Sequence, residues 1–163
     1  MKTLSGVIIR EAQPADIDFL IHLLHILFSI EEDFSFEPVR HRAGLALLLA
    51  DDRSILLVAE YKNMVIGMCS GQLMVSTAEG GLSLLVEDVV VDKPRQGKGV
   101  GTALLAALQD WAAEKQAVRL QLLADRSNTA ALNFYHGLQW RKTKLVCLYK
   151  QPETITIEDE KYA

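Results

Sequence analysis

The sequence predicts a single α/β domain in which a mixed, mostly antiparallel sheet is flanked by helices. Three observations support this prediction. Segments of helical period and short β-branched segments both occur along the chain, three apolar segments follow one another through its middle, and a glycine-rich turn joins the last of these to a helix. With 163 residues, the chain is long enough for one domain with one substantial core.

The first third of the chain predicts one short strand followed by two helices. Residues 7–10 are apolar and β-branched, which favours a strand. Pro14 and Asp16 are typical of a helix start. The apolar residues that follow at helical spacing are Ile17, Leu20, Ile21, Leu24 and Phe28. An acidic and aromatic segment, 31–37, separates this helix from a second one expected over 39–50.

The middle of the chain predicts a meander of three strands. Its expected strands are residues 54–60, 64–75 and 82–91. Lys62-Asn63 and Gly80-Gly81 separate them and favour tight turns, so we expect the strands to pair in sequence order.

The last third predicts a helix, a strand, a short helix and a final strand. Apolar residues between 100 and 112 share one helical face, and 118–124 is expected to be the strand after it. Asn128 is a candidate N-cap for a helix over 130–136, which Gly137 would end. Residues 144–149 are expected to form the last strand.

The charge of the chain argues against several kinds of partner. Lys and Arg number 17 against 21 Asp and Glu, so the net charge is −4, and most of it falls in residues 151–163. We therefore divide the chain into a domain, 1–150, and an acidic C-terminal tail, 151–163, and we expect no nucleic-acid partner. The chain has no apolar run of membrane-spanning length, and its start lacks the apolar core of a signal peptide, so we expect a cytoplasmic protein with no membrane partner.

Cysteine usage agrees with that expectation. Cys69 and Cys147 are the only cysteines, and neither belongs to a CxxC pair. They suit a reducing compartment and cannot complete a thiolate zinc site.

The glycine-rich turn is the most informative segment of the sequence. Gln96-Gly97-Lys98-Gly99-Val100-Gly101 places three of the ten glycines within five residues, between an expected strand and an expected helix. Glycines there let backbone N–H groups approach a ligand, and the helix N-terminus favours an anion such as a phosphate. A tight connection without a ligand is the simpler alternative.

Spacing distinguishes the phosphate sites that use this arrangement. A P-loop needs Lys directly before Ser or Thr, whereas here Gly101 precedes Thr102. A dinucleotide fingerprint needs GxGxxG, whereas this turn has GxGxG. Asp125 follows the next expected strand and resembles the acid that binds a ribose, so a nucleotide-binding domain stays open as an alternative.

Three segments together resemble a known family. Gln96-x-x-Gly99-x-Gly101 resembles the Q/R-x-x-G-x-G/A pyrophosphate loop of the GNAT N-acetyltransferase superfamily. Residues 86–91 resemble the fourth strand of that fold, and Asn128 with the segment 133–138 (Asn-Phe-Tyr-His-Gly-Leu) resembles its N…FY…G segment. The order of elements over 7–150 also agrees. The resemblance implies one GNAT-type domain in which the fourth and fifth strands splay apart.

The resemblance further implies an acetyl-CoA-dependent enzyme that passes the acetyl group directly to a primary amine, with acetyl-CoA as co-substrate and no metal. The pantetheine would pair with the backbone of the fourth strand, where one amide would also stabilise the oxyanion. Asn128 would contact the ligand, cap its helix, or do both. The implied cofactor-binding residues are Val89, Val90, Val91, Gln96, Gly97, Lys98, Gly99, Val100, Gly101, Thr102 and Asn128.

Two side chains are candidates for proton transfer. Tyr135 matches the tyrosine that acts as general acid in the family and would protonate the departing thiolate; its alternative is an aromatic packed under the cofactor. Glu87 is the candidate base, on the face shared by Val89 and Val91 if the strand is regular; its alternative is a polar residue at the sheet edge. Asp88 would then face the other way, although one β-bulge would exchange the two.

The acceptor is less well specified, since it could be a small-molecule amine or a protein amine. Glu31, Glu32, Asp33 and Glu37 lie where the family binds its acceptor and would attract a cationic amine such as a polyamine, an aminoglycoside or a lysine side chain; a solvated loop is the alternative. Phe34 and Phe36 would line a pocket or anchor this loop.

The histidines predict no metal site. His22 and His25 have the spacing of a ligand pair but no third ligand, and we expect His41 and His136 at the surface.

Two further possibilities concern the whole molecule. A non-catalytic acyl-CoA-binding regulatory module would keep the glycine turn without turnover. A homodimer is also possible, because the alternating residues 154–157 could add an edge strand to a partner, or this tail could be disordered.

Overall fold

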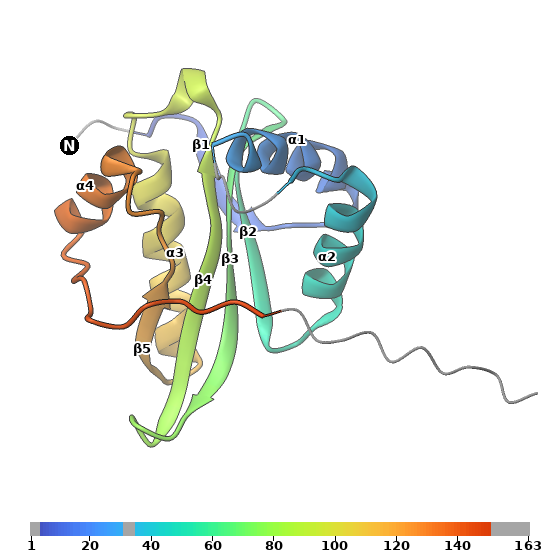
Figure 1. Ribbon diagram of the computed structural model, residues 1–163. Coiled ribbons are helices and arrows are strands. Elements are labelled where there is room, and N and C mark those ends of the chain that lie inside the picture. The colour runs from blue at the N-terminus through green and yellow to red at the C-terminus, as the bar shows by residue number, and fades with distance from the viewer. Residues whose placement is uncertain (1–3, 31–34, 151–163) are drawn as a thin grey trace, which may run out of the picture.

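A five-stranded mixed sheet forms the centre of the molecule, and helices cover both of its faces (Figure 1). The structure is a computed structural model that describes residues 4–30 and 35–150. Adjacent strands from β1 to β4 pair antiparallel, and β4 and β5 pair parallel, so the predicted fold class is confirmed. The strands, in their order across the sheet, are β1 (Val7–Glu11), β2 (Ser54–Tyr61), β3 (Met64–Ser76), β4 (Gly81–Val91) and β5 (Ala117–Leu122).

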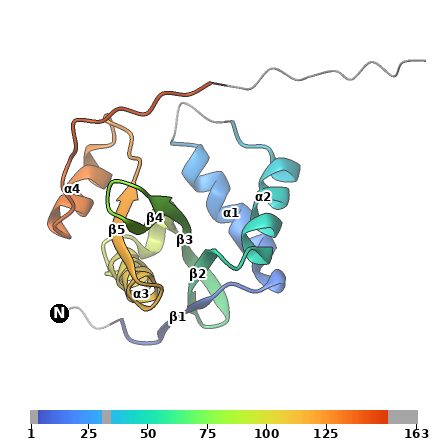
Figure 2. The same cartoon turned by 90° about the horizontal axis from the view of Figure 1, so that it is seen from below.

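The helices form two layers. Figure 2 shows α1 and α2 on one side of the sheet and α3 and α4 on the other. α3 connects β4 to β5, which is the long crossover that two parallel neighbours require. The helices are α1 (Ile17–Phe28), α2 (Pro38–Ala50), α3 (Val100–Glu114) and α4 (Thr129–Gly137), and short 3₁₀ turns, η1 (Pro14–Asp16) and η2 (Lys93–Arg95), precede α1 and the glycine turn.

Each face of the sheet has its own apolar core. The core under α3 contains Leu84, Val86, Leu104 and Leu108, and the core under α1 and α2 contains other buried residues, among them Leu20, Leu23, Leu45, Met68 and Val90. This division follows from the alternation of side chains along the strands. It also assigns a face to each residue of β4, because Val89 and Val91 pack on the α3 side whereas Val90 packs on the α1 and α2 side.

The N-terminal elements are joined by an ion-pair network. The guanidinium of Arg10 donates to both carboxylate oxygens of Asp16, at 2.8 and 2.9 Å, and through Nε to Glu60 at 2.7 Å. Asp16 also accepts from the backbone N–H of Gln13 at 2.7 Å, which holds the turn that leads into α1. The hydrogen bonds from Arg10 hold the pKa of Asp16 below its usual value, despite the opposing effect of burial.

β4 changes its pairing partway along its length. Its parallel pairing with β5 ends at Val86 and Leu122, so residues 87–91 continue without β5 beside them. On the other side, the register with β3 shifts between Met68 and Ser70, and Asp88 has a φ of +52°. The splaying of the fourth and fifth strands is therefore present, and a β-bulge lies at the point where it begins.

Some expectations about the elements need correction. Residues 144–149 form no strand: residues 141–150 are all exposed and belong to neither a helix nor a strand. The continuous apolar run at 145–149 favours a strand by residue type alone, and the segment meets no strand partner within the described residues. β5 ends at Leu122, two residues before its expected end.

Two other expectations fall outside the described residues. These are the acids at 31–33 together with Phe34, and the tail 151–163 with its alternating residues 154–157. In the described part of the chain, no helix has the length and apolar character needed to cross a membrane.

Candidate active site

The β-bulge in β4 turns two neighbouring carboxylates toward the same side of the sheet. Asp88 accepts a hydrogen bond from Ser70 Oγ at 3.2 Å, and Glu87 accepts one from Gln72 Nε2 at 3.0 Å. Both donors lie on β3, two residues apart, and therefore on one face. The expectation that Glu87 shares a face with Val89 and Val91 is wrong, because the register shift interrupts the alternation between them.

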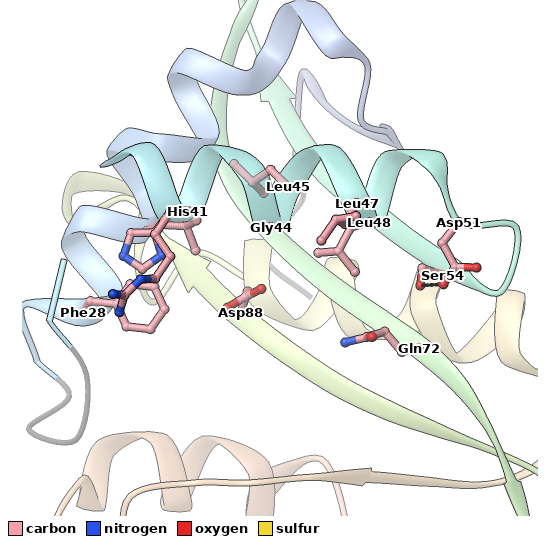
Figure 3. Close-up of a pocket in the computed structure, with 12 residues that line it drawn as sticks. Phe28, His41, Gly44, Leu45, Leu47, Leu48, Asp51, Ser54, Gln72 and Asp88 are labelled. Carbon is pink, nitrogen blue, oxygen red and sulfur yellow. Dashed lines mark hydrogen bonds between the residues drawn. The ribbon is translucent and has the colours of Figure 1, made fainter. Parts of the chain in front are cut away.

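Asp88 lies in an open groove between α2 and the sheet. The groove has a volume of about 560 Å³ (Figure 3). Asp88 is half-buried there, whereas Glu87 is exposed. The lining residues come from α1 (Leu24, Phe28), from α2 and the turn after it (Arg40, His41, Gly44, Leu45, Leu47, Leu48, Asp51) and from the strands (Ser54, Gln72, Asp88).

The environment of Asp88 favours its protonated form. Burial raises the pKa of Asp88 to about 6, the negative charge of Glu87 acts in the same direction, and the hydrogen bond from Ser70 opposes both. A carboxylate with this pKa accepts a proton readily near neutral pH, which is the property of a general base.

Asp51 provides a second carboxylate at the far end of the groove, at the C-terminus of α2. It accepts hydrogen bonds from the Ser54 hydroxyl at 2.6 Å and from the Arg53 backbone N–H at 3.0 Å. These hydrogen bonds lower the pKa of Asp51, so its carboxylate is ionised at neutral pH, whereas a small fraction of Asp88 is protonated there.

The glycine turn has the backbone form that its sequence predicts. Gly97 and Gly99 have φ values of +69° and +89°, a region that other residues enter at a cost. Gly99 is the N-cap of α3, and Val100 buries its side chain in the core beneath, whereas Thr102 is exposed in the first helical turn. The amides at the start of α3 have no acceptor within the helix and so suit an anion.

Two polar side chains of the turn hold the loop itself. Gln96 Nε2 donates to the carbonyl oxygen of Val91 at 2.9 Å, and Lys98 Nζ donates to that of Pro94 at 2.8 Å. The Asp92 N–H bonds to Ile66 on β3. By alternation, the backbone groups of Val91 point away from β3, toward the edge that β5 leaves free.

α4 lies against the start of α3. A Cβ added to Gly101 would lie 3.2 Å from Phe134 Cζ, so this glycine allows the two helices to approach closely. Asn128 caps α4 through its side-chain oxygen, which accepts from the Ala131 N–H at 3.0 Å. Tyr135 is half-buried, its ring in contact with those of Phe134 and Trp140. The structure thus brings the glycine turn and the Phe-Tyr segment together.

The histidine expectations are partly corrected. His41 is half-buried rather than at the surface, because its ring stacks on Phe28 with centroids 4.6 Å apart and on Phe36 at 5.2 Å. His22, His25 and His136 are exposed. Within residues 4–30 and 35–150, no group of three or more His, Cys, Asp or Glu side chains could hold a metal ion.

The strand with one free edge and the glycine turn that leads into a helix form the arrangement that the sequence motifs predict, and the groove beside them contains a carboxyl group of raised pKa. The chain matches the family model described as the acetyltransferase (GNAT) family over residues 20–138, and it belongs to that family.

Known relatives agree with this assignment. The chain is 37% identical over 67 residues to streptothricin acetyltransferase A of Bacillus subtilis (strain 168), a match that covers 41% of this chain and only 38% of that relative. The structure of a possible acetyltransferase from Clostridium difficile 630 superposes with a TM-score of 0.79 at 21% identity, covering 91% of this chain and 99% of that one. AAC(6')-Iy, in complex with a bisubstrate analog, superposes at 0.76 with 20% identity, over 91% and 99% of the two chains. At these identities, the two structures show the fold.

Sequence reasoning did not choose Asp88 or find the α2 wall of the groove. The adjacent acids in an apolar strand were visible, but the bulge that turns both of them toward one face depends on pairing with β3. The spacing of Arg40, Gly44, Leu47 and Asp51 along one helical stripe was a usable signal for the wall.

Proposed function

We propose that this protein transfers an acetyl group from acetyl-CoA directly to a primary amine bound in the groove beneath α2, with Asp88 as the base. The observation that carries the proposal is the position of Asp88. It lines the groove at the bulge where β4 loses its partner β5, so an acceptor in the groove and a cofactor along the free edge would meet beside one carboxylate.

The fit of acetyl-CoA is supported by backbone features rather than by charged side chains. The amides of residues 97–102 would hold the pyrophosphate, since the glycines at positive φ leave the approach open. Val91 would offer its backbone groups to the pantetheine and is favoured for the oxyanion because its N–H faces the free edge, and Val89 is its neighbour on that edge. The expected contribution of Val90 is not supported, because the same alternation turns its backbone groups toward β3. Gln96 would exchange its bond to the Val91 carbonyl when pantetheine binds. Asn128 would contact the ligand with its amide N–H group.

The proposed transfer removes two protons from the acceptor nitrogen and returns one to sulfur. Asp88 accepts the first proton from the ammonium form of the acceptor and passes it to solvent, and the neutral nitrogen attacks the acetyl carbonyl carbon. The C–N bond forms, the attacking nitrogen loses its second proton to solvent, and the C–S bond then breaks, which releases CoA as a thiolate. Tyr135 donates its hydroxyl proton to that thiolate and is reprotonated from solvent. Glu87 remains a second candidate base, but its exposure favours Asp88.

The groove favours an acceptor with more than one positive charge. Asp88 and Asp51 line it on either side of apolar leucine side chains, so a second ammonium group could pair with Asp51 while the first reacts. Arg40 lines the opposite end, where its guanidinium would repel a cation, and its ion pair with Glu37 reduces this repulsion. A small multiply charged amine therefore fits better than an isolated lysine side chain. The Bacillus subtilis relative is named a streptothricin acetyltransferase, so streptothricin is one acceptor to test.

The test combines binding with turnover. Acetyl-CoA should raise Tm, whereas NAD and ATP should not, because a ligand that binds only the folded state stabilises it by about 2.7 kcal/mol at 100 times Kd. Thiol release should then require an amine and should be faster with hexane-1,6-diamine than with hexylamine. Tight binding of acetyl-CoA with no amine-dependent release would favour the non-catalytic acyl-CoA-binding module instead. A shift with NAD or ATP alone would refute both.

A further inference from the structure

A glycine interrupts the middle of α2. Gly44 has six helical residues on either side of it, from Pro38 to Ala50. Glycine in a helix interior is unfavourable relative to alanine because the unfolded chain has more freedom to lose. A residue that weakens a helix at its centre calls for a local reason.

The backbone and the packing supply no such reason. Gly44 does not have a positive φ, and a Cβ built on it would meet no atom within 4 Å. Gly71 differs, since a Cβ there would lie 3.0 Å from side chains of Leu84 and Leu108. The fold thus requires the absence of a side chain at Gly71 but not at Gly44.

The groove supplies a reason. Gly44 lines it from the same helical stripe as His41 and Leu48, at spacings of three and four residues. Figure 3 shows Gly44 on the part of α2 that faces Asp88 across the groove. Any side chain at position 44 would enter the open space above the carboxylate.

We propose that Gly44 is a specificity-determining residue, whose missing side chain admits acceptors that carry a ring or a branch next to the reactive amine. This proposal rests on the proposed function, since it assigns the groove to the acceptor. A straight-chain amine needs only the width of a methylene chain beside Asp88, so it does not use the extra room. A ring attached to the aminomethyl carbon does use it, because the ring lies between α2 and β4 while the nitrogen reaches the carboxylate.

The experiment compares two diamines of equal charge on matched variants of the full chain. The probes are hexane-1,6-diamine and 1,4-bis(aminomethyl)cyclohexane, each assayed for kcat and KM with acetyl-CoA. Gly44→Leu fills the space above Asp88. Ala46→Leu adds the same side chain to an exposed position of α2 outside the groove. Gly44→Ala and Ala46→Gly measure the cost of glycine to the helix at the two positions.

Gly44→Leu should lower kcat/KM for the ring diamine at least tenfold relative to the linear one, mainly by raising KM, and Ala46→Leu should leave this ratio unchanged. Gly44→Ala should raise Tm by about 1–4 °C and Ala46→Gly should lower it by a similar amount. A fall of Tm in Gly44→Ala would show that the fold needs this glycine, and it would overturn the proposal. An unchanged ratio in Gly44→Leu would overturn it too.

A failure of the proposed function can be told apart from a failure of this inference. If the wild-type protein acetylates no amine, the proposed function is refuted, and Tm shifts with CoA and each diamine then decide the role of Gly44. A shift with the ring diamine that Gly44→Leu abolishes and Ala46→Leu retains supports the proposal. Equal shifts in all three proteins, or no shift in any, refute it.

Discussion

Replacement of Asp88 by Asn should stabilise the protein and abolish most of its activity. The pKa of the Asp88 carboxyl is raised from its usual value of 3.8 to about 6, chiefly by burial. A raised carboxyl pKa means that the folded state favours the protonated form. Relative to the ionised form, this contribution to stability is fully present below about pH 4 and is lost as the pH rises through about 6; relative to a neutral side chain, the same free energy is the penalty for ionisation above that pH.

The size of this effect follows from the pKa displacement. At about 1.4 kcal/mol per pKa unit, the penalty at pH 8 is at most about 3 kcal/mol. Because Asp88 is only half-buried, solvent screening reduces this penalty, and we expect Asp88→Asn to raise the free energy of unfolding by about 1–2 kcal/mol at pH 8. The amide oxygen can still accept the hydrogen bond from Ser70, so this contact is kept.

The assay pairs urea unfolding with pH–rate profiles for Asp88→Asn, Glu87→Gln and the wild type. Wild-type kcat/KM should fall as the pH drops through about 6, and Asp88→Asn should lose about 100-fold or more in rate together with this limb. Glu87→Gln should change stability by less than about 0.5 kcal/mol and keep the acid limb, moved to lower pH by the loss of its charge. If Glu87→Gln removes the limb while Asp88→Asn retains full rate, the choice of base is wrong.

Three further outcomes are expected. Tyr135→Phe should keep the fold, because the ring contacts with Phe134 and Trp140 remain, and should lower kcat at least tenfold in thiol-release assays; full turnover would exclude Tyr135 as the acid. Gly99→Ala places a side chain at a φ of +89°, so calorimetry should show a loss of about 1 kcal/mol in stability and a several-fold higher Kd for acetyl-CoA. The control is Gly137→Ala, whose added methyl group enters open space and should leave that Kd unchanged. Asp16→Asn should lower the free energy of unfolding by about 2 kcal/mol at pH 7, as measured by urea unfolding. The depressed pKa of Asp16 stabilises the fold above about pH 4, and this contribution disappears as the pH falls through the folded-state pKa. Equal pH dependence of stability in the variant and the wild type would contradict the ion-pair network.

The turns and helix caps were predictable from the sequence, because each depends on the backbone preferences of a few neighbouring residues. The turn at Lys62-Asn63, where both residues have positive φ, joins β2 and β3 as expected, and Asn128 caps its helix. The glycine turn was predictable for the same reason, because positive φ at Gly97 and Gly99 selects the residue type directly.

Features that depend on pairing between distant segments were not predictable in this way. The face of Glu87 and Asp88 is decided by a register shift against β3, which alternation along β4 alone does not contain. Residues 144–149 have a strand-like pattern, but a strand also requires a partner edge, and these residues have none in the described structure. The stacking of His41 on Phe28 joins α1 and α2, and the apolar pattern of either helix alone contains no signal for that contact.

Amine-dependent release of CoA is the measurement that tests the account most directly. Purified protein, acetyl-CoA and a series of mono- and diamines are mixed, and both the free thiol and the acetylated amine are quantified. We predict one thiol released for each N-acetyl product, faster turnover for diamines than for monoamines, and at least 100-fold slower turnover in Asp88→Asn. Acetyl-CoA that binds but is never consumed with any amine, or transfer that proceeds unchanged in Asp88→Asn, would contradict it.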